Sequence, residues 1–270
     1  MTEIVISDMQ TGLPAVIKEI AEYGALVAPR GVATVELMNA SVILLAPEEC
    51  LATGIGRKLN RGVAAVEALQ LIGGVSHPEL MGRIAPNTLQ FRDGGAFNGA
   101  YGPRIGMQLP LVVERLKRDP STRQAIITIW DPLHDLVRET SNDYPCTLSF
   151  QFLMRDGHLS MITNMRSNDV WWGFTYDVVQ FTQLQLTVAN ALGVMPGPYY
   201  HNAGSLHLYE RDIEKAMKLT SRETAAPPLR GLGYVGMDIK ETMARARGIL
   251  DGTFTDGGTE TEQWMKLAIA

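Results

Sequence analysis

Two alternating segments joined by a tight turn constrain the fold more than any other feature of this sequence. Residues 147–154 and 159–165 both read as strands, because polar and apolar side chains alternate along them. Arg155-Asp-Gly-His158 separates the two segments, and Asp-Gly in such a place is typical of a β-hairpin. We therefore expect an antiparallel pair of strands.

The remaining segments predict helices and strands together in one α+β domain. No internal repeat, low-complexity segment or change of composition marks a linker, so a single domain over residues 1–270 is expected. Residues 86–102 are rich in glycine and lack periodicity, which predicts a long loop. Periodicity predicts helices at 13–25, 62–73, 109–117, 177–192, 210–218 and 239–250. Strands are predicted at 3–6, 124–130 and 205–209, as a short strand after Pro228, and as a strand, a turn and a strand within 32–45.

The composition limits the kinds of protein that this chain can be. The net charge is −5, so the whole surface does not suit a nucleic acid, although basic side chains gathered in one pocket would suit a small anion. The two cysteines, Cys50 and Cys146, exclude a disulfide framework and favour a reducing compartment. No apolar segment reaches the ~18 residues of a membrane span, and the first residues lack a signal-peptide pattern. We expect a cytoplasmic protein without a membrane or nucleic-acid partner.

Cys146 is the candidate nucleophile. It follows Pro145 and precedes a predicted strand, which can present its sulfur at the edge of the sheet. The thiolate is the reactive form, and Arg166, on the strand that can lie beside it, can lower the thiol pKa and bind a phosphate. The alternative is that Cys146 is a small buried apolar residue, as most lone cysteines are.

Four further polar residues admit either a functional or a structural interpretation. Asp177 begins an apolar helix, where a carboxylate can simply cap the helix N-terminus. His207 and Tyr209 share one face of a predicted strand, so they can contact a ligand together or form a hydrogen-bonded polar edge. Glu67 lies on a largely apolar helix, where a carboxylate is more often directed to solvent.

The order and spacing of these residues resemble thymidylate synthases and the related cytidylate hydroxymethylases. The resemblance covers roughly residues 28–215. The matching positions are Pro145-Cys146, Arg166-Ser167-Asn168-Asp169, Gly173, the Asn/Asp position 177, His207-Leu208-Tyr209 and, upstream, Arg30, Arg57, Glu67 and Gly99-Ala-Tyr101-Gly102.

This resemblance implies a thymidylate synthase-like α+β fold, in which a mixed β-sheet is flanked by helices and two subunits pack sheet against sheet. It also implies a pyrimidine nucleotide monophosphate as substrate and 5,10-methylenetetrahydrofolate as co-substrate. In this family the cysteine adds to C6 of the pyrimidine, which makes C5 a carbon nucleophile. We expect Cys146 to act in this way, with Glu67, Asp177 and Tyr101 as further catalytic residues.

The resemblance also assigns residues to the phosphate, the sugar and the folate. Members of the family donate arginines across the dimer interface, so side chains of both subunits are expected at the phosphate. The expected phosphate residues are Arg30, Arg166, Ser167 and the partner subunit's Arg123. The expected residues for the sugar hydroxyl are His207 and Tyr209, and those for the folate are Arg57, Asp169 and Gly173.

Asp177 replaces the asparagine that thymidylate synthases carry at this position, and this departure decides the expected base. The oxygen and nitrogen of an amide match N3–H and O4 of uracil. Cytosine reverses that pattern, and a carboxyl group can accept from its 4-amino group while sharing a proton with N3. Burial would raise the Asp177 pKa and make that proton available. We therefore expect a cytosine nucleotide, CMP or dCMP.

The glycine-rich loop and three other positions also depart from the family. Residues 91–97 contain no tryptophan, whereas thymidylate synthases carry a tryptophan-rich segment that shields the C5 methylene from water. A looser cover would admit water and give a hydroxymethyl product without oxidation of the folate. The usual arginine pair is Arg123-Gln124 here, Thr147 stands where histidine is common, and Ser205 stands where aspartate is common.

The expected function is therefore folate-dependent 5-hydroxymethylation of CMP or dCMP, and two alternatives stay open. One is a thymidylate synthase or a hydroxymethylase of dUMP, in which buried Asp177 would leave a mismatched hydrogen bond that costs on the order of 1–3 kcal/mol. The other is a family member that has lost catalysis and binds nucleotides or RNA, although the intact cysteine and arginines disfavour it. These motifs do not separate ribose from deoxyribose.

Overall fold

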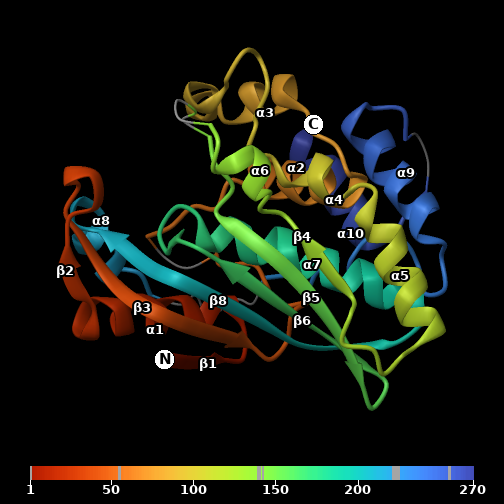
Figure 1. Cartoon of the computed structure of the whole chain (residues 1–270), viewed down its shortest axis with the longest axis horizontal. Coiled ribbons are helices and arrows are strands. Elements are labelled where there is room, and N and C mark those ends of the chain that lie inside the picture. Colours follow the sequence, from red (N-terminus) through yellow and green to blue (C-terminus); the bar gives the residue numbers. More distant parts are fainter. Residues whose placement is uncertain (1, 54–55, 139–140, 142, 221–225, 255–256) are drawn as a thin grey trace.

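A mixed β-sheet forms the centre of the protein (Figure 1). The computed structural model describes residues 2–53, 56–138, 141, 143–220, 226–254 and 257–270. The strands follow the spatial order β1-β3-β8-β6-β5-β4, while β2 pairs with β3 and β7 pairs with β8. Parallel pairs (β1 with β3, β6 with β8) and antiparallel pairs (β3 with β8, β5 with β6, β4 with β5) occur in the same sheet. The strands are β1 (Thr2–Ile6), β2 (Ala25–Val27), β3 (Thr34–Leu44), β4 (Ile126–Thr128), β5 (Thr147–Arg155), β6 (His158–Met165), β7 (Asn168–Asp169) and β8 (Met195–Tyr209).

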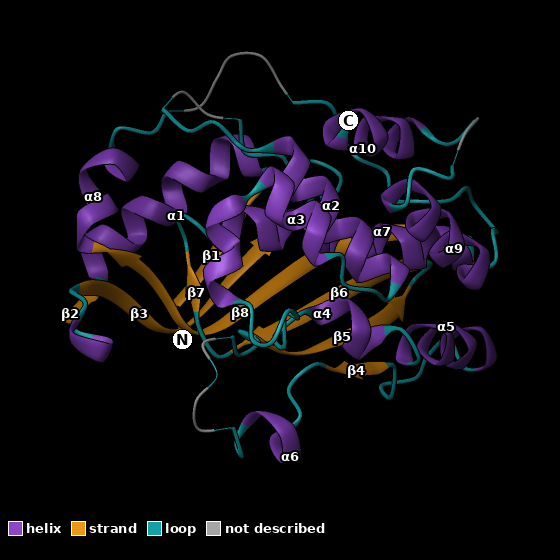
Figure 2. Ribbon diagram, turned by 90° about the horizontal axis from the view of Figure 1, so that it is seen from above, coloured by secondary structure: helices purple, strands orange, loops and turns teal. Residues whose placement is uncertain are grey.

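Helices cover one face of this sheet, which confirms the α+β expectation. Figure 2 shows α1, α2 and α7 on the same side of the strands. Helix α7 is buried nearly all round, because it lies between the sheet and α2. The helices are α1 (Met9–Tyr23), α2 (Arg61–Gly73), α3 (Pro78–Ile84), α4 (Tyr101–Ile105), α5 (Gln108–Arg118), α6 (Pro132–Asp135), α7 (Phe174–Leu192), α8 (Glu210–Met217), α9 (Ile239–Leu250) and α10 (Glu260–Ile269), with 3₁₀ segments at Pro29–Gly31 and Pro86–Phe91. Among these described helices, none is long and apolar enough to cross a membrane.

Local signals located several elements correctly. The predicted hairpin is formed by β5 and β6, and Asp156 and Gly157 in its turn have φ angles of 50° and 75°. Positive φ at both central residues is what a two-residue hairpin turn of this kind requires. Helix α7 ends at Gly193, whose φ of 69° places it in the left-handed region, as expected of a glycine after a helix C-terminus.

Two strands were mispredicted because pairing with neighbouring strands overrides local turn signals. The strand, turn and strand expected within 32–45 form the single strand β3, which remains paired with β8 on both sides of Asn39 (φ 52°). Strand β8 begins at Met195 rather than at 205, although Pro196 and Pro198 are unfavourable in strands. It lies between β3 and β6, and an irregularity in its pairing with β6 accommodates this segment.

The C-terminal region also differs from the prediction. No strand is described between residues 226 and 238, where a short one was expected. Helix α10 was missed, although Thr259 and Glu262 carry its start signal: each side chain accepts a hydrogen bond from the backbone N–H of the other. Glycines before Thr259 had suggested irregular chain instead.

Glu262 also anchors α10 to α9, and its removal is expected to destabilise the fold. Its buried carboxylate accepts hydrogen bonds from Arg245 Nε (2.9 Å) and Nη2 (2.8 Å) and from Gly233 N (3.2 Å). Burial alone would raise the Glu262 pKa, but Arg245 and the backbone donors hold it below its ordinary value. Glu262→Gln should lower the free energy of unfolding by roughly 3 kcal/mol, measured by urea denaturation, because it removes the buried charge that Arg245 pairs with. Exposed Glu260→Gln on the same helix is the control, and an equal loss in both variants would contradict this role.

Candidate active site

A cavity of about 500 Å³ lies where α2, α4 and α7 meet the ends of strands β5, β6 and β8. It brings together candidates that are far apart in sequence and contains the expected nucleophile. Its lining includes Arg30, Glu67, Gln70, Phe91, Phe97, Gly99, Tyr101, Asp143, Cys146, Arg166, Asp177, Gln180 and Tyr209. We take this cavity as the candidate active site.

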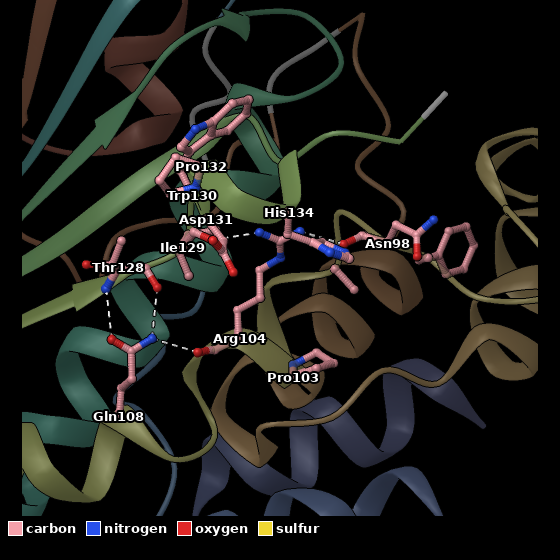
Figure 3. A pocket seen from close by; sticks show the side chains of 12 residues that line it. Asn98, Pro103, Arg104, Gln108, Thr128, Ile129, Trp130, Asp131, Pro132 and His134 are labelled. Atoms are coloured by element: carbon pink, nitrogen blue, oxygen red, sulfur yellow. Dashed lines mark hydrogen bonds between the residues drawn. The ribbon is translucent and has the colours of Figure 1, made fainter. Parts of the chain in front are cut away.

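A second cavity, of about 570 Å³, lies between α4, β4 and α6, and no cysteine is among the residues that line it (Figure 3). The Gln108 side chain accepts a hydrogen bond from the Thr128 N–H (3.0 Å) and donates one to the Thr128 carbonyl (2.8 Å). It thus pairs with β4 as the backbone of an adjacent strand would. Arg104 donates to both oxygens of Asp135 (2.6 and 2.8 Å) and to two carbonyls. These polar groups stabilise the structure around this second cavity.

Cys146 lies immediately before β5, and the residue after it pairs with the end of β6. The backbone N–H of Arg166 donates to the Cys146 carbonyl (2.9 Å), which brings the arginine beside the sulfur. Arg166 lowers the thiol pKa, as expected, but burial outweighs it and Asp177 and Asp143 add to the burial effect, so the net pKa of Cys146 is raised. Arg166 thus acts on the thiol in the predicted direction, although its effect is smaller than that of burial.

Two guanidinium groups lie at the mouth of the cavity. Arg166 is exposed, and its Nε and Nη2 donate to the carbonyls of Pro145 (3.0 Å) and Tyr144 (3.4 Å). Arg30 is also exposed and lies in a 3₁₀ segment with a φ of 54°, a conformation that few non-glycine residues adopt. Both cations line the same cavity as Cys146, which suits a bound phosphate.

Two buried carboxyl groups form the inner wall. Burial raises the pKa of Asp177 to about 7, and burial together with the charge of Asp177 raises that of Glu67 to about 8. Asp177 accepts from Asn168 Nδ2 (2.7 Å) and Gln180 Nε2 (2.9 Å). The helix-cap alternative for Asp177 was wrong, because Gly173 occupies the cap position of α7. The solvent-facing alternative for Glu67 was also wrong: its Oε2 is buried and has no hydrogen-bond partner among the described residues.

Tyr101 stands at the start of α4, close to these carboxyl groups. Burial raises the pKa of its phenol well above the ordinary value, and Asp177 and Cys146 add to the effect, so the hydroxyl stays protonated. Its ring lies 5.9 Å from that of Phe181. Gly102 permits this placement, because a Cβ there would lie 2.1 Å from the carbonyl oxygen of Val75.

His207 and Tyr209 share one face near the end of β8, as the alternation predicted. Their rings lie 5.3 Å apart at 82°, and Tyr209 lines the cavity. Ser205 Oγ lies 3.3 Å from His207 Nδ1 and donates to Glu36 on β3, the strand that pairs with β8. Glu36 thus supplies a carboxylate beside Ser205, where the family commonly has aspartate, and sequence reasoning had missed it because the two residues are distant in the chain.

The residues assigned to the folate lie behind the inner wall and do not line the cavity. Arg57 is buried, donates to Thr175 Oγ1 (2.5 Å) and packs over the Trp171 ring at 4.8 Å. Burial lowers its pKa, and its Nε has no partner among the described residues. The Asp169 carboxylate accepts from Trp171 N (2.9 Å), and its carbonyl accepts from Gly173 N (2.9 Å).

Several remaining positions lie outside the cavity or were not singled out from the sequence. Arg123 is exposed before β4 and does not line the cavity of its own chain, and neither does Ser167. Thr147 is fully buried, and its hydroxyl lies close enough to the Tyr101 phenol to lower the pKa of that group slightly. Asn168 and Gln180 are the donors to Asp177. Asn168 was named only as part of the family motif, and Gln180 was missed, although it lies one helical turn after Asp177. In the described part of the chain, no group of three or more His, Cys, Asp or Glu side chains is placed to bind a metal ion.

Known proteins resemble this chain in sequence and in fold. The family model for thymidylate synthase matches residues 96–245. Deoxyuridylate hydroxymethyltransferase of Bacillus phage SP01 is 30% identical over 282 residues, which cover 92% of this chain and 73% of that protein. The protein of the same name from Pseudomonas phage M6 is 32% identical over 199 residues, covering 71% of this chain and 56% of that protein. The crystal structure of thymidylate synthase from T4 phage has the same fold, with a TM-score of 0.70 at 20% identity over 86% of this chain and 89% of that one.

The raised thiol pKa of Cys146 is expected to show in alkylation by iodoacetamide. In the free protein the rate of alkylation should still rise with pH at values where the rate for an ordinary cysteine is already constant. The reason is that burial disfavours the thiolate. Arg166→Gln should move this profile to still higher pH, since it removes the neighbouring cation. Mass spectrometry of the labelled peptide separates Cys146 from fully buried Cys50, which serves as the internal control. A profile that levels off at low pH would contradict the dominance of burial.

Proposed function

Because the chain belongs to the thymidylate synthase family, we propose that it hydroxymethylates C5 of a cytidine nucleotide 5′-monophosphate, CMP or dCMP. As a member of this family the protein is a one-carbon transferase that uses 5,10-methylenetetrahydrofolate as co-substrate. The buried Asp177 carboxyl on the cavity wall is the observation that carries the choice of base. The names of the two phage relatives support a hydroxymethyl rather than a methyl product.

Asp177 suits cytosine because of the proton that it can share with the ring. With that proton on N3, cytosine presents two N–H donors side by side to the two oxygens of a carboxylate. Uracil offers a single donor, N3–H, next to the acceptor O4. The Asp177 pKa of about 7 leaves the proton available near neutral pH. Placing it on the ring also draws electrons away from C6, where the thiolate attacks.

The outer part of the cavity suits the phosphate and the sugar. Arg30 and Arg166 supply two cations at the mouth, and the partner subunit's Arg123 would add a third together with Ser167. Tyr209 on the wall would contact the sugar hydroxyl with His207. The contact of Ser205 with Glu36 keeps a carboxylate behind the histidine and so orients its ring.

The inner part supplies the covalent and proton-transfer chemistry. Cys146 forms the S–C6 bond, and the displaced electron pair moves into the ring, where Asp177 provides the proton. Glu67 lies beside Asp177 with an unpartnered Oε2, so it can bind a water and exchange a proton near C4 and C5. The neutral phenol of Tyr101 is a hydrogen-bond donor close to the sulfur.

The cavity offers a suitable wall for the folate beside the nucleotide. Phe91, Met81 and Val75 form an apolar side that fits a flat ring, while Arg57 and Asp169 lie behind the inner wall and would support it. When bound, the folate supplies the one-carbon unit at the oxidation level of formaldehyde. Phe91 is 45% exposed, so this side of the cavity is accessible to the water that a hydroxymethyl product requires.

Hydroxymethylation of dUMP is the second candidate, and the names of the two phage relatives favour it. It uses the same cysteine, arginines and co-substrate, and differs only in how Asp177 meets the base. A neutral Asp177 would then donate to O4 and accept from N3–H. Methylation of dUMP, the thymidylate synthase reaction, would need the folate to supply a hydride as well.

A product assay with 5,10-methylenetetrahydrofolate and, separately, CMP, dCMP and dUMP distinguishes these candidates. We expect a cytosine nucleotide to gain CH2O by mass spectrometry, without absorbance from dihydrofolate. Asp177→Asn should shift the preference towards dUMP by roughly 10- to 100-fold, because an amide matches N3–H and O4. Wild-type protein that converts dUMP alone, with no change of preference in Asp177→Asn, would contradict the choice of base.

Mixing two inactive variants tests the assignment of Arg123 to the partner's site. Arg123→Ala and Cys146→Ala are each expected to lose activity, since the phosphate contact and the nucleophile are removed. Subunit exchange should restore about a quarter of the wild-type activity, because half of the dimers are mixed and each has one intact site. Exposed Arg118→Ala is the control for a general charge effect. No recovery after proven exchange would place Arg123 in its own subunit's site or outside the site.

A further inference from the structure

A buried chain of polar side chains leads from β8 to the cavity. Tyr199 Oη lies 2.8 Å from His201 Nδ1, and His201 Nε2 lies 3.0 Å from Asn168 Oδ1. Asn168 Nδ2 then donates to Asp177 Oδ2 at 2.7 Å. All four side chains are less than a tenth exposed. None of the first three residues is used by the mechanism above.

The orientation of the Asn168 amide sets the direction of the chain. Asn168 gives its N–H to Asp177, so its carbonyl faces His201 and needs a donor. His201 Nε2 therefore carries the hydrogen, and in a neutral ring Nδ1 is then an acceptor for the Tyr199 hydroxyl. Every hydrogen bond in the chain points towards Asp177.

The surroundings of His201 keep it neutral. The Phe174 ring meets it edge to face at 4.9 Å, and the Phe181 ring stacks at 6.4 Å and 22°. Burial among these rings lowers the His201 pKa to about 3, so the imidazole does not gain a second proton near neutral pH. One ring nitrogen of His201 is therefore a donor and the other an acceptor under working conditions.

We propose that Tyr199, His201 and Asn168 are positioning residues that direct the carboxyl proton of Asp177 into the cavity, an inference that rests on the proposed function. Both recorded hydrogen-bond partners of Asp177, Asn168 and Gln180, are amide N–H donors, which cannot accept that proton. A rotated Asn168 amide would accept it, but only if the whole chain were reversed, with the His201 hydrogen on Nδ1 and directed to Tyr199. Asp177 lines the cavity, so its proton is left facing the pyrimidine.

Other titratable groups also face Asp177 and share its pH dependence. They are Glu67 on α2, Tyr101 on α4, Cys146 before β5 and Tyr199 on β8. The reaction needs the proton of Asp177, so kcat should fall as the pH rises through its pKa of about 7. Glu67, with a pKa of about 8, also loses its proton in this pH range. The decrease of kcat at high pH therefore reports the titration of both groups.

Replacement of His201 by residues that keep or lose the donor tests the proposal. In His201→Phe the Asn168 amide is free to rotate and accept the Asp177 proton, so kcat should fall roughly 10- to 100-fold with little change in nucleotide KM. The decrease of kcat at high pH should also shift to higher pH, because the loss of a hydrogen-bond donor raises the Asp177 pKa. His201→Gln can accept from Tyr199 and donate to Asn168, and should recover most of kcat. Equal losses of kcat in both variants, each folded by circular dichroism, would overturn the proposal.

The ¹⁵N NMR spectrum of the His201 imidazole tests the direction of the chain without any turnover. We expect a neutral ring with hydrogen on Nε2 from about pH 5 to about pH 8. Hydrogen on Nδ1 in the wild-type protein would overturn the proposal, even if His201→Phe does not fold. Absence of turnover with all three nucleotides would overturn the proposed function instead, and the nitrogen spectrum would still decide the direction.

Discussion

The burial of Asp177 and Glu67 beside one another is the constraint on which the rest of the site depends. Water would stabilise both charges, so keeping the pKa values near 7 and 8 requires that packing exclude water from most of their surface. Helix α7 provides one wall because it is itself covered by α2 and by the sheet. The apolar character of α7 thus serves the chemistry of the site as well as the stability of the core.

The topology of the sheet explains how distant residues reach this place. In the β5–β6 hairpin Thr147 pairs with Met165, so the start of one strand and the end of the other meet, and Cys146 lies beside Arg166. Strand β8 runs parallel to β6 and continues beyond it, which carries His207 and Tyr209 past the same edge. The nucleophile, the cation and the sugar contacts are therefore gathered by pairing between strands.

The proton on Asp177 links the choice of base to the buried chain behind it. A carboxyl group that donates with one oxygen and accepts with the other can match cytosine or uracil, depending on which oxygen carries the proton. The names of the relatives favour deoxyuridylate, whereas the argument from Asp177 favours cytosine, and a protonated carboxyl group is compatible with both bases. With either base, the site requires that the Asp177 proton be directed to the pyrimidine ring. Asn168 and Gln180 donate to Asp177 and so cannot accept this proton.

The sequence by itself determined the elements that depend on local interactions and the identity of the reactive groups. The Asp156-Gly157 turn and the end of α7 at Gly193 were predictable, because backbone conformation there depends on the residue itself. The resemblance of the motifs identified the family and the candidate nucleophile Cys146, but neither the raised pKa of its thiol nor the burial of Glu67. Those properties, like the carboxylate that Glu36 brings to Ser205, depend on neighbours from other parts of the chain. Only the tertiary structure decided them, because desolvation and hydrogen-bond direction arise from packing between elements.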